Sequence, residues 1–352
     1  MFEIVKYGGL LGKAAGVYAK RITSEQFAEM KQKTSAEEIV AQLKSHKGYS
    51  DVLSEFSERG FDREALERKL SMTIEQDFGM LYRYTTQSDA DLLKYFVIQN
   101  DVEQILKYVR LLQAKKTETY SYEPTSFITH LSRLEFSKFK TSQTLDEFIE
   151  SLSQTPYYSI MLPYKTKEGF DYTHLEGALM TFLFKKFLKL IEGHKDPGVR
   201  KELSKFVKTF IDMKNFTNVL RCLYVGQDRQ SIYGYLLPFS SDTAAKQLVN
   251  SMINAHSYDE GLALLMDSPY KKYFDTGADE GSKFIESYYL EYEYKFAKKT
   301  ITSLTPSVAL VVAYLVYKDL EVKNIIHLIE AKSYDLTTEE MERFFIGAKK
   351  AG

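Results

Sequence analysis

Tryptophan is absent from the 352 residues, and cysteine and proline are scarce, with one and seven occurrences. The single thiol, Cys222, excludes an internal disulfide framework and is typical of a reducing compartment. The longest apolar run, residues 308–317, is about half as long as a bilayer crossing requires. The first residues lack the charged-then-apolar order of a secretory signal, so we expect a cytosolic chain.

Excess charge of either sign is also missing. The sequence has 47 Lys and Arg against 48 Asp and Glu, a net charge of −1. Nucleic-acid-binding proteins depend on surplus positive charge for affinity. The balance therefore argues against a nucleic-acid partner.

Catalytic and metal-binding signatures are missing as well. The six histidines are scattered, and none stands three or four residues from another, so no metal-ligand cluster is expected. The glycine-rich stretch 7–16 resembles a phosphate loop, but it has Tyr7 where a glycine is needed and Ala14 where a Ser or Thr would hold magnesium. We instead expect its small residues to let a helix approach its neighbour closely. The sequence predicts no catalytic residue, no cofactor and no metal.

Helical periodicity, in contrast, is present almost everywhere. Hydrophobic residues make up 44% of the chain, enough for real cores, and they recur with a 3.6-residue period. We therefore predict an all-α fold.

One short helical pattern with a clear start and stop occurs three times. It opens with Ser or Thr followed three residues later by Glu, the spacing of a capping box, in which hydroxyl and carboxylate satisfy free N–H groups of the first turn. An apolar face follows, and a Gly or Pro then precedes a tyrosine. The three copies contain Ser35, Glu38 and Tyr49, then Thr144, Glu147 and Tyr157, then Ser257, Glu260 and Tyr270. The near-equal spacing of the three tyrosines along the chain indicates internal triplication.

Two further landmarks follow each tyrosine, each at a nearly constant distance. The nearer one is a glutamate preceded by Leu or Ile, in Leu66–Glu67, Leu175–Glu176 and Ile285–Glu286. The more distant one is an acid followed three residues later by an amide, in Asp101 and Gln104, Asp212 and Asn215, and Glu321 and Asn324. Acid and amide at this spacing share one edge of a helix. Two of these helices run into comparable basic ends, at Ala114–Lys115 and Ala331–Lys332, and the middle one runs to Gly226.

These landmarks divide the chain into three domains of about 110 residues, each large enough for its own core. We place them at residues 1–118, 119–230 and 231–352, with joints in the polar stretch 115–124 and the turn-rich stretch 224–241. Residues 194–198 are expected to form a loop within the second domain.

The repeated polar residues allow more than one interpretation. Acids at helix starts are favourable near the positive end of the helix dipole, which explains them better than catalysis does. The acid and amide of the long helix could pin a helix crossing or cap a neighbouring helix, because buried amides usually satisfy backbone groups. They could also face a central partner, and both interpretations stay open.

The order of these landmarks resembles a known family, the C subunit of the prokaryotic V/A-type rotary ATPase, which is the counterpart of the eukaryotic d subunit. The most specific stretch is residues 312–332, which is similar to the family pattern Y-x-x-x-K-x-x-E-x-K/R-N-L. The residues that match it are Tyr314, Lys318, Glu321, Lys323 and Asn324. Departures are Gln104, where the family more often has Asn, and Gly48, where the other two copies have Pro.

The resemblance implies three similar helical domains arranged with pseudo-threefold symmetry as a funnel. It implies a non-catalytic central-stalk connector, one copy per complex, on the cytoplasmic face of the membrane. The implied partners are the D- and F-type rotor subunits and the proteolipid (c/K) ring, and the implied role is to couple ATP hydrolysis to proton or sodium transport. We expect a polar, charged funnel mouth and a ring-facing side with apolar and basic residues. The repeated residues are candidates for these interfaces: Glu38, Tyr49, Asp101, Gln104, Glu147, Tyr157, Asp212, Asn215, Glu260, Tyr270, Lys318, Glu321 and Asn324.

Two alternatives belong to other classes of protein. One is an α-helical scaffold of a non-rotary complex, which would recover only soluble partners in a pull-down from solubilised membranes. The other is an α-helical enzyme built on acid pairs, which requires a pocket with a carboxylate of strongly perturbed pKa. Triplication argues against the enzyme, since an active site seldom needs three copies of the same acid.

Overall fold

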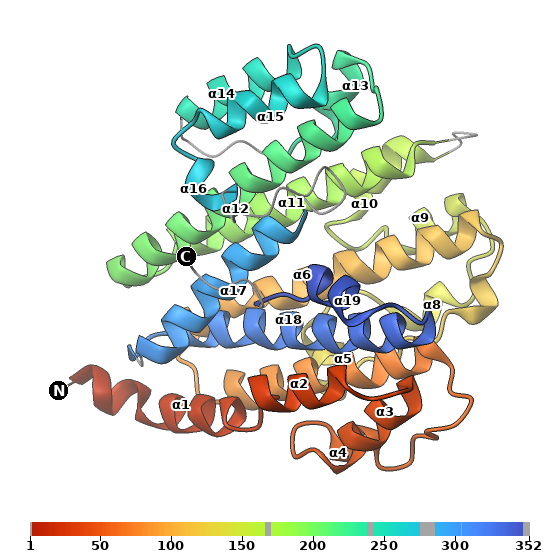
Figure 1. Cartoon of the computed structure of the whole chain (residues 1–352), viewed down its shortest axis with the longest axis vertical. Coiled ribbons are helices and arrows are strands. Elements are labelled where there is room, and N and C mark those ends of the chain that lie inside the picture. Colours follow the sequence, from red (N-terminus) through yellow and green to blue (C-terminus); the bar gives the residue numbers. More distant parts are fainter. Residues whose placement is uncertain (1, 166–169, 238–242, 275–285, 304, 348–352) are drawn as a thin grey trace. The chain divides into compact units, whose positions relative to one another are not determined.

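The computed structural model describes residues 2–165, 170–237, 243–274, 286–303 and 305–347. Every regular element in these ranges is a helix, so the all-α prediction is confirmed (Figure 1). Ile285, expected in the third leucine–glutamate landmark, lies outside the described residues.

The chain divides into two compact units. Unit 1 combines residues 1–87 with 271–352, and unit 2 is the continuous segment 88–270. The division into three domains at residues 118 and 230 stays a prediction. The helices of unit 1 are α1 (Phe2–Tyr18), α2 (Ser24–Lys31), α3 (Ala36–Ser45), α4 (Ser50–Leu53), α5 (Arg63–Tyr82), α16 (Lys271–Phe274), α17 (Glu286–Ser303), α18 (Val308–Ser333) and α19 (Thr338–Phe344). Those of unit 2 are α6 (Gln87–Gln113), η1 (Thr117–Thr119), α7 (Ser126–Leu131), α8 (Phe136–Phe139), α9 (Leu145–Ser151), α10 (Tyr158–Met161), η2 (Leu162–Tyr164), α11 (Tyr172–Glu192), α12 (Pro197–Tyr224), α13 (Arg229–Gly234), α14 (Thr243–Ile253) and α15 (Tyr258–Met266).

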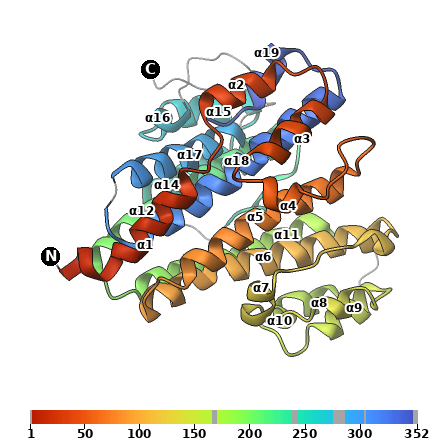
Figure 2. The ribbon, with the colours of Figure 1, turned by 90° about the horizontal axis from the view of Figure 1, so that it is seen from below.

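Helix α18 is the central element of unit 1. It packs against α1, α3, α5, α17 and α19 (Figure 2). Most of its residues are buried. A helix that is apolar nearly all round is stable only when it is surrounded, which explains the apolar run that opens it. None of the described helices is long and apolar enough to span a membrane.

The core of unit 1 joins the two ends of the sequence. Side chains from the N-terminal part of the chain, including Met30 and Leu43, pack with Ile325 and Ile329 of α18 and with Met341 of α19. This unit is therefore completed only when the last helices of the chain have docked.

Unit 2 is organised around α12 and an aromatic cluster beside α6. Helix α12 packs against α11, α13, α14 and α15. Tyr108 of α6 contacts the rings of Tyr120, Phe139 and Phe148 at centroid distances of 4.8 to 5.3 Å. Aromatic rings bury large areas and have preferred mutual geometries, so this cluster fixes α8 and α9 against α6 although both helices are short.

The close approach expected at the glycines of α1 occurs at one position. A Cβ built on Gly9 would lie 3.2 Å from the Tyr84 ring, so this glycine does admit a close neighbour. No described atom lies within 4 Å of a Cβ built on Gly8, Gly12 or Gly16. The small residues at those three positions are therefore not required by packing within unit 1.

The loop expected at residues 194–198 is shorter than predicted. Pro197 and Gly198 already belong to α12, and Asp196 is its N-cap. Proline suits the first helical position, where its missing N–H would have no partner in any case.

Candidate functional site: the repeated acid and tyrosine pairs

The three predicted capping hydroxyls all function as N-caps. The side chains of Ser35, Thr144 and Ser257 accept the N–H groups of Glu38, Glu147 and Glu260 at 3.2 to 3.3 Å. Each satisfies one of the donors that the first helical turn leaves free. The starts of α3, α9 and α15 are thus set locally by the sequence.

The glutamates of these caps differ from the expected capping box in all three copies. Each carboxylate accepts the N–H of the residue before the N-cap, from Thr34, Gln143 and His256, at 2.7 to 3.0 Å. The N-cap φ angles are −142°, −124° and −152°, against −80° and −66° at the two reciprocal boxes that start α2 and α19. The more extended N-cap turns its own N–H away from the carboxylate, and the preceding N–H takes its place. These glutamates are exposed, and the N–H of Thr34 lowers the pKa of Glu38.

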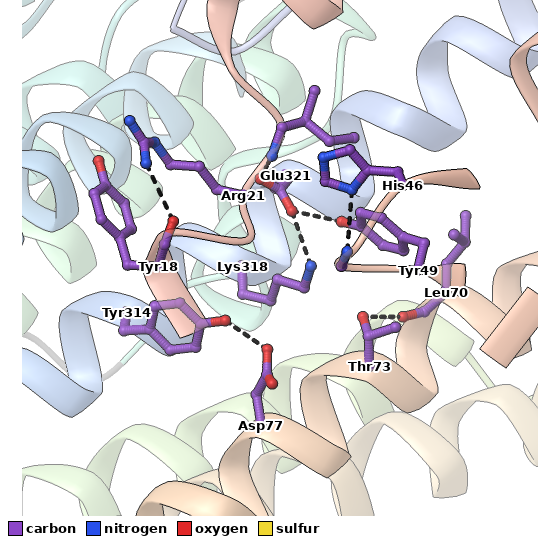
Figure 3. A network of polar contacts seen from close by, with 12 residues as sticks. Tyr18, Arg21, His46, Tyr49, Leu70, Thr73, Asp77, Tyr314, Lys318 and Glu321 are labelled. Atoms are coloured by element: carbon purple, nitrogen blue, oxygen red, sulfur yellow. Dashed lines mark hydrogen bonds and ion pairs between the residues drawn. The ribbon is translucent and has the colours of Figure 1, made fainter. Parts of the chain in front are cut away.

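The first tyrosine closes a buried network in unit 1 (Figure 3). The hydroxyl of Tyr49 donates to Glu321 Oε1 at 2.6 Å, and Lys318 Nζ donates to the same oxygen at 2.9 Å. The backbone N–H of Ile22 donates to Oε2 at 2.8 Å. Tyr49, Lys318 and Glu321 are at most 3% exposed, and the ammonium also lies 3.9 Å from the centre of the Tyr49 ring. We use the term joint for the pair formed by an acid of a long helix and the tyrosine whose hydroxyl donates to that acid.

A second phenol and carboxylate lie next to this joint. The hydroxyl of Tyr314 donates to Asp77 of α5 (Figure 3). Burial raises the pKa of Asp77, and the hydrogen bond from Tyr314 offsets part of that rise. Burial also raises the pKa of Tyr49 well above its ordinary value, with the Glu321 carboxylate adding to the effect. These phenols therefore stay protonated and act as donors.

The equivalent joint of unit 2 has different chemistry. Tyr157 donates to Asp101 Oδ2 at 2.9 Å, and Ser132 donates to Oδ1 at 2.6 Å. The N–H of Arg133 also bonds the carboxylate. Asp101 is 1% exposed and has no cationic partner among the described residues. Burial accordingly raises its pKa to about 6, although all three hydrogen bonds act in the opposite direction.

The remaining acid of the repeat, Asp212, is buried on α12. The ring of Tyr270 packs against Phe216, one turn further along the same helix, with ring centroids 4.8 Å apart. The repeat predicts that Tyr270 donates to Asp212. In the joints of Asp101 and Glu321 the tyrosine belongs to the copy that follows the acid, when the chain is read as a cycle. In the sequence these tyrosines serve only as markers of spacing, and their partners were not predicted.

The amides of the long helices bind backbone. Asn324 donates to the carbonyl of Ile346 at 2.9 Å and accepts its N–H at 2.8 Å. Asn215 makes the same pair of bonds with Leu237, at 3.3 and 2.8 Å, and in both cases the partner is 22 residues further on. Gln104 instead accepts the hydroxyl of Tyr120 at 3.2 Å. Asn324 and Asn215 thus bind the backbone of a following non-helical segment, which is neither the helix crossing nor the helix end considered from the sequence.

The long helices also end in the same way, at a register that the sequence did not reveal. Lys115, Gly226 and Asp335, each eleven residues after the amide, have φ angles of +54°, +71° and +53°. The N–H of the next residue returns to the carbonyls of Leu111, Cys222 and Ala331, in each case at 2.9 Å. This is the Schellman end of a helix. Lys115 therefore corresponds in register to Asp335, and Lys332 lies three residues earlier, in the last turn of α18.

Two further features carry no sequence signal that we recognised. In unit 2, His194 Nδ1 accepts the N–H of Asp196, so its protonated Nε2 donates to the buried Asp89 at 3.0 Å. In unit 1, a cavity of about 320 Å³ lies beside the Glu321 joint and is lined by α2, α17, α18 and the C-terminal segment. Lys31 lines it and pairs with Glu342 at 2.6 Å.

The arrangement is suited to holding helices together. Within the described ranges, no group of three or more His, Cys, Asp or Glu side chains is placed to hold a metal ion. Cys222 is buried, and burial raises the pKa of its thiol, which disfavours the reactive thiolate. The hydrogen-bond partners described above for the repeated residues lie within the chain, and a role of these residues as an interface stays a prediction.

Comparison with known proteins gives a consistent result over almost the whole chain. The family model described as ATP synthase (C/AC39) subunit matches residues 10–344. The A-type ATP synthase C subunit of Methanocaldococcus jannaschii is 24% identical, and the alignment covers 98% of this chain and 88% of that protein. The A-type ATP synthase C subunits of Thermococcus kodakarensis and Pyrococcus horikoshii are each 24% identical, covering 98% and 90% of this chain and 91% and 84% of their own lengths.

Proposed function

Because the chain belongs to the ATP synthase (C/AC39) subunit family, we propose that it is the non-catalytic connector between the rotor shaft and the membrane ring of a V/A-type rotary ATPase. The observation that carries this proposal is the match over residues 10–344. A match of this extent includes all three copies of the repeated pattern, so the proposal applies to the chain as a whole.

The proposed architecture follows the three copies. We propose three similar helical domains at residues 1–118, 119–230 and 231–352, related by a pseudo-threefold axis and enclosing a funnel. The equivalent contacts of Asp101 with Tyr157 and of Glu321 with Tyr49 support repetition at the level of structure. A protein with three near-equivalent surfaces is suited to a cyclic partner such as a ring.

The proposed partners are the D- and F-type rotor subunits, which enter the funnel, and the proteolipid ring below it. The chain lies on the cytoplasmic face of the membrane, one copy per complex, and contributes no catalytic group. Torque passing through it must be resisted by its own packing. The buried joints support this role, since hydrogen-bonded charges in a low-dielectric interior are costly to separate.

Reconstitution of the ATPase with and without this chain tests the proposal. Without the chain, the head should still hydrolyse ATP, but ATP-driven ion uptake into vesicles should be lost, and the stalk should no longer co-purify with the ring. Adding back the purified chain should restore both. Stoichiometric recovery of stalk with ring in its absence would overturn the proposal, and capture of soluble partners alone would favour the scaffold.

A further inference from the structure

The joints of Glu321 and Asp101 differ in the groups that donate hydrogen bonds to the acid. In unit 1, Glu321 accepts from the ammonium of Lys318 and from the N–H of Ile22, and neither group can act as an acceptor. The buried acid of this joint is thus paired with a buried cation.

The joint of unit 2 is built differently. Two of the donors to Asp101 are the hydroxyls of Ser132 and Tyr157, and each can donate or accept. A protonated carboxyl can donate to one hydroxyl and accept from the other, while its carbonyl oxygen keeps the N–H of Arg133. The hydrogen bonds are thus preserved in number when the proton binds, and the cost of burying an uncompensated charge disappears.

We propose that Asp101 is a proton-binding site that tightens unit 2 when the pH falls. The proton binds to a carboxylate oxygen, and the segments that carry Ser132 and Tyr157 are held more firmly against α6. This inference concerns unit 2 alone and goes beyond the proposed function, because it does not depend on any partner.

Among the charged and titratable groups that face Asp101, Asp101 itself is the one that changes its protonation state between pH 5 and pH 7. From the segments packed against α6, the phenol of Tyr157 donates to it, and the negative charge of Asp101 acts on the phenol of Tyr120. Burial raises the pKa of both phenols far above neutrality. The side chain of Arg133 is exposed, and the hydrogen bond to the carboxylate comes from its backbone.

The sign of the effect follows from the pKa of about 6 in the folded chain, against an ordinary 3.8. A carboxyl with a raised pKa adds stability below its unfolded value and loses it as the pH rises through its folded value. Between pH 5 and pH 7 this group alone should lower the folding constant by about tenfold. The change is the reverse of that produced by an ordinary salt-bridged aspartate.

The test uses the full chain and Asp101→Asn, which imitates the protonated acid. Infrared difference spectra between pH 5 and pH 7 should show a protonated-carboxyl band in the wild type, and Asp101→Asn should remove the component of that band that belongs to Asp101. As the pH falls, the unfolding midpoint of the wild type should rise relative to the unfolding midpoint of Asp101→Asn. Glu321→Gln is the matched control and should leave the infrared band in place.

A second variant covers the case in which Asp101→Asn does not fold. Tyr157→Phe removes a hydrogen bond that stabilises the carboxylate, so the titration of the band should move to higher pH. If Tyr157 had only a structural role, the pH midpoint of the infrared titration would be unchanged. Absence of the band at pH 5 in the wild type, or a band of unchanged intensity in folded Asp101→Asn, would overturn the proposal.

Discussion

Substituting the residues of positive φ that end the three long helices tests how much each Schellman end contributes to the free energy of unfolding. The changes are Lys115→Gly, Asp335→Gly and Gly226→Ala, at positions with φ angles of +54°, +53° and +71°. A Cβ at such a φ is strained by roughly 1–2 kcal/mol for most residues, and Asp tolerates the conformation better than Lys. Glycine removes the strain, but its greater backbone freedom stabilises the unfolded chain by about 0.5–1 kcal/mol.

The expected order follows from these two effects. Lys115→Gly should stabilise unit 2 by about 0.5–1 kcal/mol, and Asp335→Gly should stabilise unit 1 by less than about 0.5 kcal/mol. Gly226→Ala should destabilise by about 0.5–1 kcal/mol. No described atom lies within 4 Å of a Cβ at Gly226, so this cost is conformational and not a clash. In a domain of this size, about 1 kcal/mol shifts the melting temperature by roughly 2–4 °C.

Thermal unfolding of the full chain, with hydrogen exchange at the last turn of each helix, measures these changes. Gly60→Ala is the matched control, since Gly60 has a φ of +58° outside any helix and should also lose stability on substitution. Gly8→Ala should gain about 0.5–1 kcal/mol, because it improves helix propensity at an open position. The reasoning would be refuted if Lys115→Gly destabilised the protein while Gly226→Ala left it unchanged.

Four further substitutions probe the interior, each measured by the denaturant midpoint of the full chain. Asn324→Ala leaves a buried backbone N–H and carbonyl without partners and should lower the free energy of unfolding by about 2–4 kcal/mol. Gln104→Ala loses one hydrogen bond and should lower it by about 0.5–1.5 kcal/mol. Equal losses would contradict the role of Asn324 in holding the following segment. Gly261→Ala should cost about 1–3 kcal/mol, because the added Cβ would lie 2.7 Å from Leu223 Cδ1, and a neutral result would show that α15 shifts freely. Glu321→Ala should cost about 3–5 kcal/mol, because it leaves a buried ammonium unpaired, and a loss below about 1 kcal/mol would refute the ionic character of that joint.

Local features of the fold could be predicted from the sequence. The helix starts at Ser35, Thr144 and Ser257 depend on residues within one turn, and the predicted hydroxyls do cap them. The all-α class follows from periodicity, which each helix carries in its own residues. The capping glutamates differed only in which N–H they accept, since that choice depends on the φ angle of the N-cap.

Long-range pairing could not be predicted in the same way. Tyr49 and Glu321 are 272 residues apart, and Tyr157 and Asp101 are 56 apart. Each motif was visible alone, but no local rule states which tyrosine meets which acid, because that depends on how complete helices dock. The shared helix end was not visible in the sequence either, because the residues eleven after the amides, Lys115, Gly226 and Asp335, share neither size nor charge. The residues that the two asparagines bind, Leu237 and Ile346, are apolar like many others in the chain.

The difference between the joints of Glu321 and Asp101 has a physical reason in the topology. Closing the loop of 272 residues costs about 1.4 kcal/mol more than closing the loop of 56, by the logarithmic dependence on loop length. The longer loop is closed by the joint that contains Lys318, whose ammonium bonds Glu321 and lies over the Tyr49 ring. A buried ion pair adds little net stability compared with apolar packing, but it penalises every arrangement in which one charge lacks its partner. Specificity of this kind is needed where the two ends of the chain must find each other, and it is less needed in unit 2, whose helices follow one another directly. The joint of unit 2 therefore holds together without a cation, and its acid is left free to titrate.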